Sequence, residues 1–286
     1  MEGPISAKAV HVMALHAGEG FGVPQDWATA LDLLLRSAEL GWPLAQASLA
    51  GLAGEWALAR ELANGDAATP GDWKRMRSSI DLAKWFAVPK MGIVSASPRI
   101  AIVENFASSE VCDWLIARAR TRLGPASVFD LLSGGPAHEP VRDNSECHFP
   151  IDDGDLILQF LRSRIAAVTE LFVTGMEAPA VLHYTAGQRF LPHYDFLDEA
   201  HPGHKTEIAK GGQRVLTFLL SLNDDYEGGE TSFPIIGKRY RGRKGNALFF
   251  WNVEPDGTPD KRVLHAGLPP TLGEKWMLSQ WIRGRF

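Results

Sequence analysis

The sequence has little cysteine: Cys112 and Cys147 are the only two among its 286 residues. Two thiols cannot form the disulfide framework of a small secreted domain or the cysteine cluster of a structural zinc site. We therefore expect a structural thiol at each position. The chain also lacks a run of about 18 apolar residues that could span a bilayer. Its start, MEGPISAKAVHVMALHAGEG, lacks the basic residues and apolar core of a signal peptide. These absences favour a reducing, cytoplasmic location.

An excess of positive charge is lacking as well, since 29 Lys and Arg residues face 34 Asp and Glu residues, for a formal net charge of −5. Such a chain has no general basic field for nucleic acid or an anionic membrane, so we expect neither as a partner. The exception is KRYRGRK, residues 238–244, in which five of seven residues are basic. A solvated hairpin and a contact for an acidic substrate are the two interpretations of this stretch.

Residues 1–90 have the pattern of packed helices. In DWATALDLLLRSAEL, Ala30, Leu34 and Ala38 recur every four residues behind a helix-capping Asp26. Many of the other apolar positions are alanine, which lets helices approach closely. The pattern therefore suits stacked helical hairpins.

Part of this region, ALHAGEGFGVPQDWATALDLLLRSAELGWPLAQASLAGL, resembles a Sel1-like repeat, a relative of the tetratricopeptide repeat. The matching positions are Ala14, Gly18, Gly22, Val23, Asp26, Ala30, Ala38, Gly41 and Ala45. One good copy is visible, and repeats of this kind need neighbours to bury their faces. The resemblance implies a segment that docks on the rest of the protein or on a protein partner. A plain structural cap is the alternative.

The character of the sequence changes after AVPKMGIVSASPRI, in which Pro89 and Pro98 mark a domain boundary. RIAIVENF has the composition of a strand. We expect helices over SSEVCDWLIARARTRL, capped near Ser108, and over DDGDLILQFLRSRIAAVTEL, with Leu158, Leu161, Ile165 and Val168 on one face.

From residue 180 onward, short β-rich segments alternate with Gly, Pro, Asn and Asp turns, which favours an antiparallel sandwich or barrel. The expected fold class is α+β. A small all-α domain would occupy residues 1–90, and a β-rich domain with supporting helices would occupy residues 98–286.

A possible metal site lies in QRFLPHYDF, residues 188–196. In a strand, His193 and Asp195 would project from one face. The pair alone is weak evidence, but RVLHAGLPP supplies His265 in a further β-like segment. Two histidines and one carboxylate on one side of a metal form the facial triad of non-haem Fe(II) oxygenases. That triad leaves positions open for a cosubstrate and dioxygen, unlike a closed zinc site.

Residues 180–286 resemble the catalytic core of the prolyl 4-hydroxylase family of Fe(II)- and 2-oxoglutarate-dependent dioxygenases. YTAGQRFLPHYDF matches the family's lead into the His-x-Asp motif. RVLTFLLSLND, EGGETSFP and KGNALFFWN match the next three strand motifs in order. LHAGLPPTLGEKWMLSQWI matches the closing stretch with its distal histidine and Lys-Trp. The resemblance implies a double-stranded β-helix, or jelly roll, and is looser over residues 98–179.

The resemblance also implies roles for single residues. His193, Asp195 and His265 would be the ligands of Fe(II), and Lys275 would pair with the distal carboxylate of 2-oxoglutarate. Tyr184 occupies the position of a phenol that helps to hold the cosubstrate, and Arg142, in VRDNSE, occupies the position of a substrate-groove arginine. A core tyrosine and a structural ion pair are the respective alternatives.

Several other residues near the motifs are expected to have no role in metal binding. Thr217 and Trp281 are expected to pack in the core. His201 and His204 lie in a polar, Gly-rich segment, residues 197–213, that resembles the loop closing over the substrate in this family. We expect both histidines to be solvent-exposed or on the substrate side, and not metal ligands.

The function implied by the resemblance is hydroxylation of prolyl residues in a peptide or protein, with release of succinate and CO2 and with ascorbate rescuing uncoupled turnover. The same chemistry on another side chain or on a small molecule is an alternative. A non-catalytic interaction protein that works through the Sel1-like segment is another, and a non-oxidative metal enzyme on a cupin-like barrel is a third. A proline-rich peptide is the first substrate to test.

Overall fold

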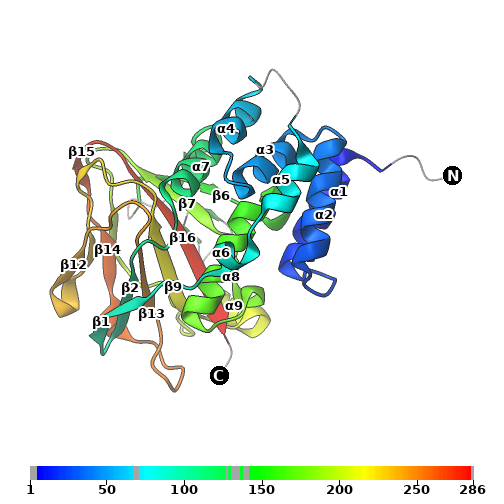
Figure 1. Ribbon diagram of the computed structural model, residues 1–286. Coiled ribbons are helices and arrows are strands. Elements are labelled where there is room, and N and C mark those ends of the chain that lie inside the picture. The colour runs from blue at the N-terminus through cyan, green and yellow to red at the C-terminus, as the bar shows by residue number, and fades with distance from the viewer. Residues whose placement is uncertain (1–4, 67–70, 127, 130–135, 138–141, 285–286) are drawn as a thin grey trace. The chain divides into compact units, whose positions relative to one another are not determined.

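The chain folds as two units, each described here by itself (Figure 1). The first consists of Met1–Val88 together with Phe149–Thr174, and the second consists of Pro89–His148 together with Gly175–Phe286. The computed structural model describes residues 5–66, 71–126, 128–129, 136–137 and 142–284. Within those ranges, no helix is both long enough and apolar enough to cross a membrane.

The first unit is helical. Its helices are α1 (Ala7–Glu19), α2 (Trp27–Glu39), α3 (Pro43–Leu52), α4 (Trp56–Asn64), α5 (Trp73–Ser79), α6 (Leu82–Phe86) and α8 (Leu156–Thr169). Asp26 caps α2 by accepting hydrogen bonds from the backbone amides of Ala28 and Thr29. The predicted face of this helix is confirmed, because Ala30 and Leu34 are fully buried.

Helix α8 packs with the N-terminal helices, although the sequence analysis placed it in the β-rich domain. Phe160 is fully buried and stacks on Trp27, with ring centroids 4.4 Å apart, and Phe86 lies 5.0 Å away on another side. Arg162 forms an ion pair with Glu19 at 2.6 Å. The aromatic contacts are long-range in sequence, so helical periodicity could not reveal which unit this helix joins. The Sel1-like identity of the unit stays a prediction.

The second unit contains two main antiparallel sheets. The larger has the order β1-β2-β13-β9-β16-β7-β6-β3 and the smaller the order β12-β11-β14-β8. The strands of the larger sheet are β1 (Met91–Ala96), β2 (Arg99–Val103), β3 (Gly124–Pro125), β6 (Ser145–His148), β7 (Ala180–Tyr184), β9 (Gln213–Ser221), β13 (Ala247–Trp251) and β16 (Lys275–Gly284). Those of the smaller are β8 (Phe190–His193), β11 (Thr231–Phe233), β12 (Lys238–Tyr240) and β14 (His265–Gly267). Two short pairs, β4 (Val128–Phe129) with β5 (Pro136–Ala137) and β10 (Glu227–Gly228) with β15 (Pro270–Leu272), complete the set.

A hydrophobic core joins the two sheets. It contains Ile100, Leu219, Leu248, Phe250 and Met277 from the larger sheet and Phe233 and Val263 from the smaller sheet or its edge. Strand β9 is the centre of the arrangement, since it pairs with β13 on one side and β16 on the other. Every residue of β9 except one is buried, as expected for a strand covered on both faces. The α+β class and the jelly roll are confirmed.

Two segments differ in detail from the expectation. The stretch expected as the domain boundary contains β1, which pairs with β2, so the second unit begins at Pro89. The segment 197–213 was expected as a loop, but it contains α9 (Pro202–Gly211), a helix with Pro202 at its first turn. Proline is tolerated there because the first amides of a helix have no partner within the helix.

The basic stretch at residues 238–244 begins in the edge strand β12 and continues into a turn. Arg241 donates a hydrogen bond to the carbonyl oxygen of Asp224 at 3.0 Å, and Lys244 forms an ion pair with Asp113 at 2.6 Å. Lys238 and Arg239 are exposed. Lysine on an edge strand discourages edge-to-edge pairing, so part of this charge has a structural explanation.

Candidate active site

His193 and His265 lie directly opposite each other in the antiparallel pairing of β8 with β14. Asp195 follows two residues after the end of β8. Each of the three offers one ligand atom, and these atoms lie within 4.8 Å of one another. It is the one group of three or more His, Cys, Asp or Glu residues found within metal-binding reach in the described ranges.

Backbone carbonyls fix the orientation of both imidazoles. The Nδ1 atom of His193 lies 2.8 Å from the carbonyl oxygen of Leu191, and that of His265 lies 3.0 Å from the carbonyl oxygen of Val263. A carbonyl can only accept, so each Nδ1 carries a proton, and Nε2 is the ring nitrogen that remains for a metal ion. The Nε2 atoms approach the carboxylate of Asp195 at 3.6 and 3.4 Å. Two Nε2 atoms and one carboxylate therefore converge, which is a donor set that suits a divalent metal ion.

Burial and mutual interaction set the protonation of these groups. Burial, followed by the neighbouring His265, lowers the pKa of His193 to about 3. Burial raises the pKa of Asp195, but His265, His193 and the Thr217 hydroxyl outweigh it and hold that pKa below the ordinary range. A neutral imidazole beside an ionised carboxylate is the form that binds metal without first losing protons.

The three side chains open on a cavity of the second unit. Its walls come from both sheets and combine polar groups with apolar ones. They are formed by Arg142, Glu146, Ala178, Ala180, Leu182, Tyr184, Phe190, His193, Asp195, Leu219, Thr231, His265, Gly267, Lys275, Met277, Ser279 and Trp281. A mostly apolar pocket with a few converging polar groups is the usual form of a small-molecule site.

Lys275 is a buried cation in the lining of this cavity. It lies opposite Tyr184 in the pairing of β16 with β7, and 2% of its surface is exposed. Its Nζ donates to the carbonyl oxygen of Gly229 at 2.7 Å, which uses one of its three N–H groups. Burial lowers the pKa of Lys275 to about 8, opposed by the charge of Glu230. A lysine with remaining donors in an apolar wall is suited to hold an anion.

Glycine at position 229 makes room for that lysine. Its φ of +67° is in the left-handed region, and a Cβ there would lie 2.9 Å from Tyr226 Cε2 and 3.3 Å from Lys275 Cδ. A side chain would be strained by the backbone angle and would also crowd the aromatic ring. Close packing against Tyr226 and Lys275 therefore explains the second glycine of the EGGETSFP motif.

Comparison with known proteins decides the family. The model of the 2OG-Fe(II) oxygenase superfamily matches residues 179–283. Prolyl 4-hydroxylase 1 of Arabidopsis thaliana is 35% identical over 208 residues, which cover 68% of this chain and 72% of that protein. Probable prolyl 4-hydroxylase 3 of the same plant is 34% identical over 66% of this chain and 71% of its own length. The chain belongs to the prolyl 4-hydroxylase family of 2OG-Fe(II) oxygenases.

A solved structure supports the same placement. The viral collagen prolyl hydroxylase of Paramecium bursaria Chlorella virus-1, in a 2OG complex, aligns with a TM-score of 0.51 and 27% identity. The alignment covers 65% of this chain and 96% of that one. As a member of this family, the protein is a 2-oxoglutarate-dependent dioxygenase that uses Fe(II).

In this family member, Arg142 and Tyr184 both line the cavity. Arg142 is 8% exposed, forms an ion pair with Glu146 at 2.7 Å and lies 4.8 Å above the ring of Phe190. The structural ion pair, which the sequence left as the alternative, is therefore present. Tyr184 is 3% exposed, and burial raises its pKa to about 12, so the phenol keeps its proton.

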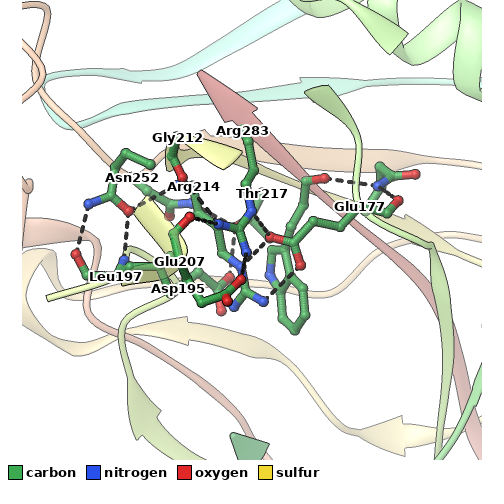
Figure 2. Close-up of polar contacts among 12 residues, drawn as sticks. Glu177, Asp195, Leu197, Glu207, Gly212, Arg214, Thr217, Asn252 and Arg283 are labelled. Carbon is green, nitrogen blue, oxygen red and sulfur yellow. Dashed lines mark hydrogen bonds and ion pairs between the residues drawn. The ribbon is translucent and has the colours of Figure 1, made fainter. Parts of the chain in front are cut away.

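The segment 197–213 is closed at its base by one side chain (Figure 2). The Gln213 amide accepts from the backbone N–H of Leu197 and donates to the carbonyl oxygen of the same residue, both at 2.7 Å. Arg283 of β16 donates to the carbonyl oxygens of Glu207 and Gly212 at 3.2 Å. Helix α9 is therefore attached at the end of β16.

Glu177 anchors this attachment. It accepts from Arg283 at 2.6 Å and from Arg214 through both carboxylate oxygens at 2.7 and 2.8 Å. Burial raises the pKa of Glu177, but the two arginines outweigh burial and lower it. The guanidinium of Arg214 also lies 3.7 Å above the ring of Trp281, a wall of the cavity. A chain of charged contacts thus extends from α9 to the site.

Three further histidines near the motifs, His183, His201 and His204, lie outside the triad. His183 stacks on Trp276 with ring centroids 4.1 Å apart and faces Glu274, away from the triad. His201 and His204 belong to the α9 segment, where the Nδ1 of His204 accepts from the backbone N–H of Asp198 at 3.0 Å. Neither is part of the metal-binding group.

Sequence reasoning missed two kinds of site residue. Thr217 was expected to pack only, yet its hydroxyl donates to the Asp195 carboxylate at 2.7 Å. Thr231 and Glu146 line the cavity without having been singled out. Thr231 could have been noticed in the EGGET motif, and Thr217 in the alternation of side chains along β9. Neither signal shows a site residue by itself, because the sequence does not tell which strand face points to the triad.

Replacing Lys275 with methionine should remove the buried charge while keeping most of the side-chain volume. We expect the Kd for 2-oxoglutarate to rise on the order of 100-fold, because one partner of a buried ion pair is lost. The Kd for the metal should stay within about threefold, since Lys275 is not one of the converging ligands. Anaerobic titration of both ligands checks this; unchanged 2-oxoglutarate affinity would contradict the assignment.

The affinity for 2-oxoglutarate should also fall as the pH rises above about 8. The pKa of Lys275 is lowered to about 8, so its charged form is complete below that pH and declines about tenfold per unit above it. The measurement is the Kd for 2-oxoglutarate between pH 7 and 10. In a Lys275→Arg variant the guanidinium stays charged throughout, so this decline should disappear; an equal decline in both proteins would exclude Lys275 as its cause.

Proposed function

We propose that this protein hydroxylates prolyl residues of a peptide or protein, consuming 2-oxoglutarate and dioxygen and releasing succinate and CO2. The observation that carries the proposal is the pairing, in one buried cavity, of a His-Asp-His group with a buried lysine. The relatives' names, Prolyl 4-hydroxylase 1 and Probable prolyl 4-hydroxylase 3, support the prolyl substrate.

His193, Asp195 and His265 would hold Fe(II). Their fit rests on three features: two imidazoles whose Nδ1 protons are fixed by carbonyls, a buried carboxylate, and converging ligand atoms within 4.8 Å. Fe(II) and 2-oxoglutarate together supply the oxidation, in which one oxygen atom of dioxygen enters succinate and the other enters the substrate. The protein's own contribution is to bind, orient and shield the reactants.

Lys275 would bind the distal carboxylate of 2-oxoglutarate, with Tyr184 opposite it in the strand pairing and Thr231 also lining the cavity. The phenol of Tyr184 keeps its proton, so it can donate a hydrogen bond to a carboxylate without adding negative charge. A dicarboxylate held at one end by a metal and at the other by a cation has a fixed position and direction. Such positioning is a large part of catalysis in a bimolecular step.

The substrate side of the cavity would be formed by Arg142 and Phe190. The ion pair with Glu146 holds the Arg142 guanidinium against the Phe190 ring, which would place a fixed positive charge at the wall of the cavity. Helix α9 would help to exclude water while the reaction proceeds. Arg283 and Gln213 hold that segment in place.

The proposal also includes a reductant, a cellular location and a role for the helical unit. Ascorbate would restore the iron after turnover without substrate, and the protein would work in the cytoplasm. The helical unit would carry a Sel1-like repeat that binds a protein partner. Its own interior is already filled, because Phe160, Leu15 and Leu49 are fully buried, so a partner would meet its outer surface.

The decisive experiment incubates the purified protein with Fe(II), ascorbate and 2-oxoglutarate, with and without proline-rich peptides. We expect succinate to form and the peptide to gain the mass of one oxygen atom. A peptide in which alanine replaces proline is the control and should stay unmodified. Succinate without peptide oxidation would redirect the search to another side chain or a small molecule. No succinate from metal-loaded protein would refute the activity.

His265→Ala should abolish succinate formation, a loss of at least about 100-fold, and weaken metal binding. His183→Ala is the matched control, because His183 is similarly buried but faces Glu274 instead of the metal group. Melting curves of both metal-free variants show whether the fold is retained. Full turnover in a folded His265→Ala protein would remove this histidine from the metal centre.

A further inference from the structure

The carboxylate of Asp195 is held by a neighbour on the larger sheet. Asp195 is 5% exposed, and its Oδ2 accepts a hydrogen bond from the hydroxyl of Thr217 at 2.7 Å (Figure 2). Thr217 lies in the middle of β9, where it pairs with Phe250 on one side and Trp281 on the other. Its backbone therefore cannot move without disturbing the central strand of the sheet.

Asn252 holds the threonine in turn. Its Nδ2 lies 3.0 Å from Thr217 Oγ1 (Figure 2). The backbone of Asn252 is itself fixed, since its N–H donates to Val215 at 2.8 Å and its carbonyl accepts from Asp260 at 3.0 Å. Three buried groups thus form a row that starts at Asn252, directly after the end of β13, and finishes at the carboxylate of Asp195.

The direction of this row follows from hydrogen-bond chemistry. An ionised carboxylate only accepts, so the single proton of the Thr217 hydroxyl points to Asp195. The lone pair of that hydroxyl must then accept from a donor, and an amide NH2 group is one. If the Asn252 amide were turned around, its oxygen and the Asp195 carboxylate would both have to accept the single hydroxyl proton of Thr217. The row therefore runs as Asn252 donating to Thr217 and Thr217 donating to Asp195.

The row has a cost that apolar packing would avoid. Asn252 is fully buried, and its Oδ1 makes no hydrogen bond to any described residue. An unpaired buried acceptor is destabilising, and apolar side chains of the same size could be neutral or better. A residue chosen for stability alone would not be an asparagine. The cost indicates that its NH2 group serves the site.

We propose that Thr217 and Asn252 are positioning residues that fix the plane of the Asp195 carboxylate for metal binding. The inference rests on the proposed function, in which Asp195 is a metal ligand. The two histidines stand on β14 and β8, whereas Asp195 lies beyond the end of β8. The strand pairing that orients the histidines therefore does not orient Asp195, and the row from β9 does.

Thr217→Val tests the first link, because valine has the same shape without the hydroxyl. We expect the Kd for Co(II), used as an anaerobic spectroscopic probe of the centre, to rise about 10- to 100-fold, the usual effect of losing a group that orients a metal ligand. Thr217→Ser should retain most of the affinity. Ser221→Ala is the matched control, since it removes another buried hydroxyl of β9 and should leave the Co(II) Kd unchanged.

Asn252→Leu tests the second link. Alone, it should raise the Co(II) Kd about fivefold, because the threonine hydroxyl loses the donor that orients it. In the Thr217→Val background the same change should have no effect on the Kd, because Asn252 acts only through that hydroxyl. An equal effect in both backgrounds, or none in either, would refute the claim that Asn252 acts on Asp195 through the Thr217 hydroxyl.

The outcomes separate the inference from the function on which it rests. Wild-type protein that fails to bind Co(II) would refute the proposed metal centre itself. Wild-type protein that binds Co(II), with a Thr217→Val variant whose Kd is within threefold, would refute the positioning role alone. The melting temperature of each metal-free variant shows whether it is folded. If Thr217→Val does not fold, an unchanged Kd in Asn252→Leu overturns the inference.

Discussion

His193 and His265 are far apart in the sequence but lie opposite each other where β8 pairs with β14, and this register is the constraint on which the site depends. In a strand, neighbouring side chains point to opposite faces, so a slip of one residue would turn one imidazole away from the cavity. The hydrophobic core between the sheets, with Phe233 next to β14 and Phe250 on β13, makes such a slip costly. Packing of apolar residues thus determines the geometry of the polar ones.

Most polar groups of the site are buried, and most are held by a second group. Carbonyl oxygens fix the imidazoles, Thr217 fixes Asp195, and Gly229 accepts from Lys275. Buried charges and dipoles are tolerated when their hydrogen-bonding capacity is used. The same contacts that make the polar groups tolerable also orient them, so stability and function share one set of interactions here.

The sequence was sufficient for what is local or carried by a motif. The His-x-Asp pair, the distal histidine, the lysine ten residues later and the alternation of the late strands all point to a jelly-roll oxygenase, and the helix caps at Asp26 and Ser108 are confirmed. These features depend on short-range periodicity or on a side chain meeting its own backbone.

What the sequence could not show depends on tertiary contacts. Helix α8 has an apolar face that would suit either unit, and the stacking of Phe160 on Trp27 decides between them. Thr217 resembles any β-branched residue of a buried strand until Asp195 is found beside its hydroxyl. The ranges of α9 and β1 were obscured by Gly, Pro and polar residues, whose local signal favours a turn.

The closure of segment 197–213 by Gln213 has a consequence for how such a protein can diversify. Both ends of the segment meet at Leu197, where one amide side chain substitutes for a strand pair. Because loop length alters closure entropy only slowly, the segment between these ends can change in length or composition while Leu197, two residues after Asp195, keeps both hydrogen bonds to Gln213. The strands that line the cavity are thus separate in the chain from a segment whose length and composition can vary.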